Sequence, residues 1–202
     1  MDWNDPKRAP GPLAVVQDFV NTASHIHGSD TLETPAQTSV ELATLGLITG
    51  GDHIEETDRQ RLVAFREALR GLLLTHNSNA NNEADLRASA KALDDIVGAV
   101  PMRVRFSPNG RPTLQPSAES TPVDQAIGCM LAVMAASQVE GKWQRLKTCR
   151  NDACRWAFFD ASRNRSGRWC DMNVCGVRNK MRTYRERRRS AAHPDLAESD
   201  SG

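Results

Sequence analysis

Four cysteines are the residues whose types and spacing point most clearly to chemistry. They form two C-x4-C pairs separated by 15 residues, at Cys149, Cys154, Cys170 and Cys175. Each pair closes a short turn and presents two sulfur atoms from one side, so two pairs can complete a tetrahedron around one ion. The spacing predicts a single structural Zn²⁺ ion, because four protein ligands leave no position for a catalytic water.

Other interpretations of these cysteines stay open at this point: an iron–sulfur cluster, a redox-active disulfide pair, or free buried thiols. Disulfides are disfavoured in a reducing cytosol. Basic residues flank the cysteines and would lower thiol pKa values, at Lys147, Arg150, Arg155, Arg168 and Arg178. The fifth cysteine, Cys129, lies in an apolar helical stretch and is interpreted as a small core residue.

Basic residues follow the last cysteine at helical spacing. One stripe recurs at i, i+4, i+7 and i+11 and is widened by Lys180, Arg187 and Arg188; its members are Arg178, Arg182, Arg185 and Arg189. Val177, Met181 and Tyr184 form a second, apolar stripe, which is expected to pack on the zinc core. Residues 142–190 hold 15 Lys and Arg against 4 Asp and Glu, a net charge of +11 in a chain whose net charge is +1. Such asymmetry indicates a polyanionic partner.

Nucleic acid is the polyanion that this segment fits. Arginine pairs bidentately with phosphate or guanine, and neutralising five phosphates would give a salt slope of about −4.5. The candidate nucleic-acid-binding residues are Arg163, Asn164, Arg165 and Arg168 in the loop between the cysteine pairs, and Arg178, Asn179, Lys180, Arg182, Arg185 and Arg189 in the helix. The alternative is a solvated loop followed by a solvated helix that binds nothing.

The remaining elements suggest a mainly helical body with one small β-hairpin. Apolar periodicity predicts helices over 13–23, 38–46, 58–73, 84–97 and 123–139, and leaves open whether the last one continues through Trp143 and Leu146. Thr38 and Asp58 are the expected N-caps. A Pro-Asn-Gly turn at 108–110 between alternating segments predicts the hairpin. We therefore expect an irregular arm (1–12), a helical body (13–141), a small four-cysteine zinc finger ending in a basic helix (142–190) and an acidic, disordered tail (191–202).

Polar residues beside the first predicted helix form a candidate ligand pocket: Asp18, Asn21 and Thr22. The alternative is a satisfied polar cluster or a helix cap. His25 and His27 would share a face on a strand, but two ligands alone rarely make a metal site. The sequence has no Gly-rich phosphate loop, Ser nucleophile elbow or HExxH motif, so we expect no enzymatic activity.

Two stretches resemble known families. From Leu146 to Gly176, the pattern of cysteines with Trp156, Phe158, Asp160, Asn164 and Trp169 resembles the CGNR zinc finger, although Cys175-Gly176-Val177-Arg178 has Val where that family has Asn. Asp18-Phe19-Val20-Asn21-Thr22 resembles the opening motif of the ABATE domain, which usually precedes that finger. The resemblance covers about residues 13–189 and implies a stress-induced, DNA-binding transcriptional regulator.

Two hypotheses follow. In the first, the finger binds DNA and the body binds a small-molecule effector or forms a homodimer, which would supply symmetric half-sites. In the second, the zinc-stabilised module binds RNA or protein without sequence-specific recognition of DNA. No apolar run approaches the ~18 residues of a membrane span, and the N-terminus lacks the apolar core of a secretory signal. We therefore expect a cytoplasmic location.

Overall fold

The computed structural model describes residues 7–77 and 83–192, and within them all side chains except those of residues 186, 187 and 189–192. The body comprises α1 (Leu13–Val20), β1 (Ala23–Ser24), β2 (Ser29–Asp30), α2 (Pro35–Thr44), α3 (Glu56–Thr75), α4 (Glu83–Val97), β3 (Met102–Phe106), β4 (Pro112–Pro116) and α5 (Pro122–Val139). The C-terminal part comprises η1 (Trp143–Arg145), β5 (Leu146–Thr148), β6 (Ala157–Phe159), the π-helical turn η2 (Met172–Gly176) and α6 (Val177–Ala192). The fold is mainly α with short antiparallel strand pairs, as predicted.

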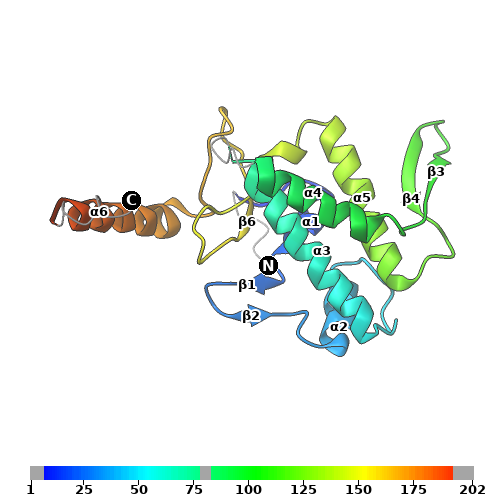
Figure 1. The fold of residues 1–202 in the computed structure, drawn as a ribbon. Coiled ribbons are helices and arrows are strands. Elements are labelled where there is room, and N and C mark those ends of the chain that lie inside the picture. Colours follow the sequence, from blue (N-terminus) through cyan, green and yellow to red (C-terminus); the bar gives the residue numbers. More distant parts are fainter. Residues whose placement is uncertain (1–6, 78–82, 193–202) are drawn as a thin grey trace, which may run out of the picture.

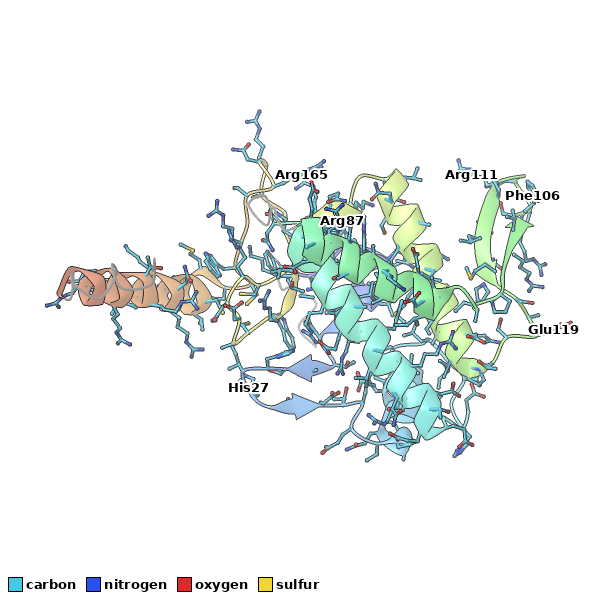
Figure 2. The ribbon with its side chains drawn as sticks, viewed as in Figure 1. His27, Arg87, Phe106, Arg111, Glu119 and Arg165 are labelled. Carbon is cyan, nitrogen blue, oxygen red and sulfur yellow. The ribbon has the colours of Figure 1, made fainter. Side chains whose placement is uncertain are left out.

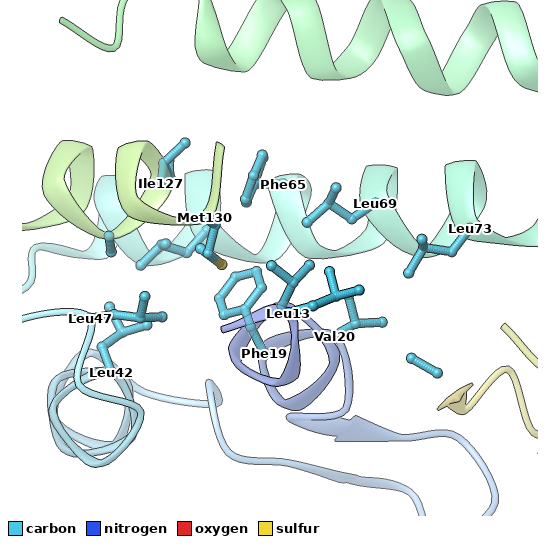
Figure 3. Close-up of a cluster of buried hydrophobic side chains, with 14 of the residues drawn as sticks. Leu13, Phe19, Val20, Leu42, Leu47, Phe65, Leu69, Leu73, Ile127 and Met130 are labelled. Carbon is cyan, nitrogen blue, oxygen red and sulfur yellow. The ribbon is translucent and has the colours of Figure 1, made fainter. Parts of the chain in front are cut away.

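Helix α3 is the centre of the body, with α1 and α5 packed against it (Figure 1). Leu62, Phe65, Leu69 and Leu73 of α3 recur at helical spacing and are fully buried. Phe65 packs on Phe19 of α1, with ring centroids 6.0 Å apart (Figure 3). Burying side chains of this size contributes about 1.5–3 kcal/mol each, so this cluster is the main source of stability.

Two predicted helix starts are wrong. Helix α2 begins at Pro35, where the Thr34 side chain accepts a hydrogen bond from the Gln37 N–H. Thr38 is buried inside the helix and donates its hydroxyl to the Thr34 carbonyl, 2.8 Å away. Proline at the first helical position, with its fixed φ, explains the earlier start. Helix α3 begins at Glu56, which places Asp58 in the first turn instead of at the cap.

Helix α5 ends where predicted, without continuing further, and helix α1 ends earlier than predicted. Helix α5 ends at Val139, and Gly141 follows with φ at +68°, a left-handed conformation that turns the chain away. Trp143 and Leu146 therefore belong to η1 and β5 and do not continue the helix. Helix α1 ends at Val20, because Asn21 caps it and the chain then enters β1.

The β3–β4 hairpin confirms the prediction of a hairpin around the turn at 108–110. Val104 pairs with Leu114 across it, and the hairpin stands at the opposite end of the molecule from α6 (Figure 1). Its base packs on α5, where a Cβ at Gly128 would lie 2.8 Å from Pro116 Cβ. This close approach requires glycine at position 128.

Strands β5 and β6 join the C-terminal part to the body. Leu146, Ala157 and Phe159 of these strands are buried in the same hydrophobic cluster as Phe19 and Phe65. The hydrophobic core of the body therefore continues past residue 141, where the net charge of the chain changes sign, into β5 and β6. Residues 7–12 of the expected arm form no helix or strand, and most of the expected tail, 193–202, lies outside the described residues. Among the described residues, no helix is long and apolar enough to span a membrane.

Candidate metal centre and nucleic-acid interface

The four predicted ligands come together at one point. The sulfur atoms of Cys149, Cys154, Cys170 and Cys175 all lie within 4.8 Å of one another. Cys170 Sγ is 3.6 Å from Cys154 Sγ and 3.8 Å from Cys175 Sγ. A tetrahedron with Zn–S bonds of about 2.3 Å has edges of about 3.8 Å. The geometry therefore fits one structural zinc ion, whereas a multi-iron cluster would need thiolates further apart.

The thiol pKa values of the cluster show what a bound cation would contribute. Hydrogen bonds from Cys154 and Cys170 hold the pKa of the Cys149 thiol well below its ordinary value. The same interactions with Cys149 raise the pKa of the Cys154 thiol and that of the Cys170 thiol. Without an ion, Cys149 ionises readily whereas Cys154 and Cys170 resist ionisation, and a divalent ion would hold all its sulfur ligands as thiolates. Zinc would serve here as a structural ion that fixes the two cysteine turns to each other.

The two cysteine turns are closed by local hydrogen bonds. The Cys154 N–H donates to the Asn151 carbonyl at 2.7 Å, and the Asn151 side chain donates to Cys175 Sγ at 3.6 Å. In the second turn, the Asp171 carboxylate accepts from the Val174 N–H at 2.9 Å. Trp156 and Trp169 pack half-buried on the cysteines and form part of the small core around the site. Asn151 was not predicted as a site residue, and its only sequence signal is its place inside the first C-x4-C turn.

The basic loop between the cysteine pairs is anchored by a buried ion pair. Lys147 Nζ lies 2.8 Å from Asp160 Oδ2 and also donates to the Arg165 carbonyl at 2.6 Å. The Asp160 carboxylate accepts from the Ser162 and Gly167 N–H groups at 3.0 and 2.8 Å. Burial alone would raise the pKa of Asp160, but these hydrogen bonds outweigh it and lower the pKa to about 2. The loop is therefore fixed at both ends, with its side chains turned outward.

The candidate nucleic-acid-binding residues lie on this loop and on α6. In the loop, the side chains of Arg163, Asn164, Arg165 and Arg168 are exposed, and Arg165 extends outward from the loop (Figure 2). On α6, which projects away from the body (Figure 1), Arg178, Lys180, Arg182 and Arg185 are exposed, and Asn179 is half-buried. Asn179 accepts a hydrogen bond from Arg182 at 3.1 Å. The Arg189 side chain lies outside the described part of the chain.

The prediction that the apolar stripe of this helix packs on the zinc core is wrong. Val177, Met181 and Tyr184 are 50%, 49% and 57% exposed. The cause is the direction of α6, which contacts η2 at its start and then projects away from the body (Figure 1). The three residues do share one face of the helix, but the zinc core does not cover that face.

Of the three candidate pocket residues, only Asp18 lines the cavity beside α1. Asp18 pairs with Arg8 at 2.7 Å and borders a cavity of about 530 Å³ together with Val15, Leu47 and Cys129. Asn21 instead binds the backbone of Ala157, donating to its carbonyl at 3.0 Å and accepting from its N–H at 2.7 Å. The Thr22 hydroxyl is within hydrogen-bond distance of the Phe19 carbonyl, at 2.8 Å, and of buried Arg66, at 3.1 Å. The side chains of Asn21 and Thr22 thus stabilise the fold through hydrogen bonds, whereas that of Asp18 borders the cavity.

The histidines form no metal site within the described residues, where the four cysteines are the one ligand cluster found. His25 and His27 follow β1 in a turn, so they do not share a strand face. His25 Nε2 lies 4.0 Å from Glu67 Oε2, a contact open to solvent. His76, for which no role was predicted, is mostly buried, and its Nδ1 lies 2.7 Å from the Leu146 carbonyl oxygen. It joins α3 to the strand that leads into the zinc site.

The fold and the four-sulfur site define a zinc-finger protein in which one four-cysteine finger is built onto a helical body. Comparison with protein families agrees: residues 145–188 match the CGNR zinc finger, and residues 13–140 match the ABATE family, described as "Putative stress-induced transcription regulator". The chain therefore belongs to the ABATE family and carries a CGNR zinc finger. A search of curated proteins finds no match.

Proposed function

We propose that the protein is a DNA-binding transcription regulator whose zinc finger contacts DNA through α6 and the basic loop. The observation that carries this proposal is the exposed arginine-rich surface of α6, which extends beyond the rest of the molecule (Figure 1). An unobstructed helix of this kind can enter a major groove. The exposed loop between the cysteine pairs would contact the adjoining backbone phosphates.

The distribution of charge supports an approach in which the finger, and not the body, faces the DNA. Residues 1–141 contain 11 Lys and Arg against 18 Asp and Glu, a net charge of −7, whereas residues 142–190 carry +11. A polyanion would be repelled by the body and attracted by the finger. Zinc would contribute by holding the start of α6 against the anchored loop.

We further propose that the body controls the finger. The Asp18 cavity lies against α1, and Gln17 of α1 and its C-cap residue Asn21 contact the finger directly, because both donate to the Ala157 carbonyl. An effector in this cavity would act on β6 through that helix. A homodimer would add a second finger and give the affinity that one small module lacks.

The exposed apolar residues of α6 favour a second candidate function. Val177, Met181 and Tyr184 form a hydrophobic edge that a DNA backbone would not cover. A protein partner that packs on this edge would make the finger a protein-binding module. DNA is preferred because the same helix exposes Arg178, Lys180, Arg182 and Arg185 around that edge.

A charge-reversal experiment tests the proposal. The variant Arg178→Glu/Lys180→Glu/Arg185→Glu is compared with a hairpin variant of equal charge change, Arg103→Glu/Arg105→Glu/Arg111→Glu, on fragmented genomic DNA and on RNA of the same sequences. The α6 variant should lose at least about 100-fold in DNA affinity and the hairpin variant less than about threefold. Equal losses in both variants, or undiminished binding in the α6 variant, would contradict the proposal. Binding that favours RNA over DNA at two salt concentrations would support the RNA alternative.

A further inference from the structure

A cavity of about 340 Å³ lies directly beside the zinc site and has an unusual lining. Four arginines surround it, together with one indole and one amide side chain: Arg150, Arg155, Arg168, Arg182, Trp169 and Asn179. Two of the arginines, Arg150 and Arg155, are half-buried. Ordinary ligand cavities are mostly apolar, so this convergence of guanidinium groups points to an anion.

One acidic residue holds two of these arginines in place. The Asp152 carboxylate contacts the Arg155 guanidinium and lies 3.7 Å from that of Arg182. The lining therefore keeps a formal charge of +3, and two of its guanidinium groups share one acidic partner. Planar guanidinium groups in such a cluster match the oxygens of a phosphate. Trp169 supplies an apolar wall against which a sugar ring can lie.

The walls of this cavity are the two cysteine turns themselves. Arg150 and Arg155 each follow a zinc ligand, whereas Arg168 and Trp169 come just before Cys170. The turns are joined where the Arg150 N–H donates to the Arg168 carbonyl at 3.1 Å. From the body, Arg70 donates to the Arg155 carbonyl at 2.8 Å. Separation of the turns would move Arg150 and Arg155 away from Arg168, so the geometry of the cavity depends on the same turns that hold the four sulfur atoms together.

We propose that this cavity binds one phosphate group of a nucleotide, and that phosphate and zinc stabilise each other's binding. The source that fits best is a backbone phosphodiester of DNA, because the cavity also includes Asn179 and Arg182 of α6. In that respect the inference rests on the proposed function. The four arginines act on one phosphate, whereas the arginines spread along α6 each meet a different one.

This difference makes the salt dependence of binding diagnostic. The cavity variant Arg150→Gln/Arg168→Gln is compared with the helix variant Arg178→Gln/Arg185→Gln, in which the same charge is removed seven residues apart, about 10 Å along the helix. Binding of a fluorescent duplex is measured by anisotropy at several salt concentrations. Loss of one phosphate contact should reduce the magnitude of the slope by about 0.9 in the cavity variant, and loss of two should reduce it by about 1.8 in the helix variant. Affinity in the cavity variant should fall about tenfold or more.

A second arm uses thymidine 5′-monophosphate as a free nucleotide. Its ³¹P resonance should shift on addition of wild-type protein and of Arg150→Lys, which keeps the charge, but not on addition of Arg150→Gln/Arg168→Gln. If wild-type protein binds no duplex but shifts this resonance, the phosphate site holds and the DNA-binding function fails. If the resonance does not shift, and the cavity variant binds duplex as wild type does, the inference is overturned.

The coupling to zinc is measured by equilibrium competition with a chelator of known zinc affinity. Saturating duplex should raise the zinc affinity of wild-type protein about fivefold or more, and leave that of the cavity variant unchanged. Both proteins should bind one zinc ion per chain before the competition, which shows that the variant has folded. An equal rise in both proteins would show that DNA protects zinc without the cavity and would overturn the coupling.

Discussion

Lys147 Nζ and Asp160 Oδ2 lie 2.8 Å apart, and neither side chain is more than 1% exposed. This ion pair sits on β5 and at the end of β6, between the hydrophobic core and the basic loop. Each partner also binds the backbone of the loop: Lys147 donates to the Arg165 carbonyl, and Asp160 accepts from the Gly167 N–H. The pair therefore determines the shape of the loop that carries Arg163 and Arg165.

Removal of one partner should be far more costly than removal of both. Asp160→Ala leaves the Lys147 ammonium buried without its counter-ion, and we expect a loss of about 3–5 kcal/mol in the free energy of unfolding. The double variant Lys147→Met/Asp160→Leu removes both charges and should be less destabilised than Asp160→Ala. Urea unfolding followed by circular dichroism measures both. The single variants Lys147→Met and Asp160→Leu complete the cycle, and a double variant destabilised by the sum of these two changes would show that the pair is not coupled.

The loop also contains a glycine that the ion pair makes necessary. A Cβ at Gly167 would lie 2.7 Å from both Cγ and Oδ1 of Asp160, whose carboxylate is fixed by hydrogen bonds and cannot move aside. We expect Gly167→Ala to destabilise the protein by about 1–3 kcal/mol. Gly50→Ala is the matched control, because a Cβ there meets nothing within 4 Å. In thermal unfolding, Gly167→Ala should melt at a lower temperature than Gly50→Ala. Equal melting temperatures would contradict the proposed clash with Asp160.

Stability should depend on pH through His76. Burial lowers its pKa below the ordinary value; the hydrogen bond to the Leu146 carbonyl opposes this shift, and the Lys147 charge adds to it. The unfolded chain therefore takes up a proton more readily than the folded one, and stability is lost as pH falls below about 6.5. His76→Gln should show a smaller loss between pH 7.5 and 5.5. Zinc release at low pH affects both proteins alike, so the difference between their urea midpoints isolates His76. Parallel pH profiles would rule out this role.

Zinc removal should destabilise the body as well as the finger. Leu146 and Phe159 belong to the same core as Phe19, and the strands that carry them lead into the cysteine turns. We expect purified protein to contain one zinc ion per chain, and excess chelator to lower the melting temperature of the whole chain in a single transition. Cys149→Ser should reproduce the effect, whereas Cys129→Ser should retain zinc. Unchanged melting of α1 and α3 after complete zinc removal would contradict the shared core.

The residues that sequence alone identified correctly are those whose signal is local. The four cysteines, the β3–β4 hairpin and the existence of α3, α4, α5 and α6 follow from spacing within a short stretch of chain. The prediction that Thr38 caps α2 is wrong because Thr34, four residues earlier, caps the helix and Pro35 begins it. Contacts between distant residues had no local signal. Asn21 and Ala157 are 136 positions apart, and nothing near either residue indicates that they bind each other.

The same limitation explains the error on α6. Its apolar stripe at Val177, Met181 and Tyr184 has the period of a packed helix, but period alone does not tell which surface covers it. The arginine cavity was overlooked for a related reason. Arg150, Arg155 and Arg168 are separated by up to 18 positions and meet only when the four sulfur atoms close the two turns.

Shared burial of β5 and β6 has a consequence for protein engineering. The finger is not an independent unit. Transplanting residues 142–192 to another protein would expose Leu146, Ala157 and Phe159 to solvent. It would also leave the Ala157 N–H and carbonyl without the hydrogen bonds that Asn21 makes to them. Chimaeras that aim to redirect this protein should therefore exchange only the surface of α6 and the loop. We expect a graft cut at residue 141 to aggregate even with zinc bound, and a host that retains α1 and α3 to accept an altered α6.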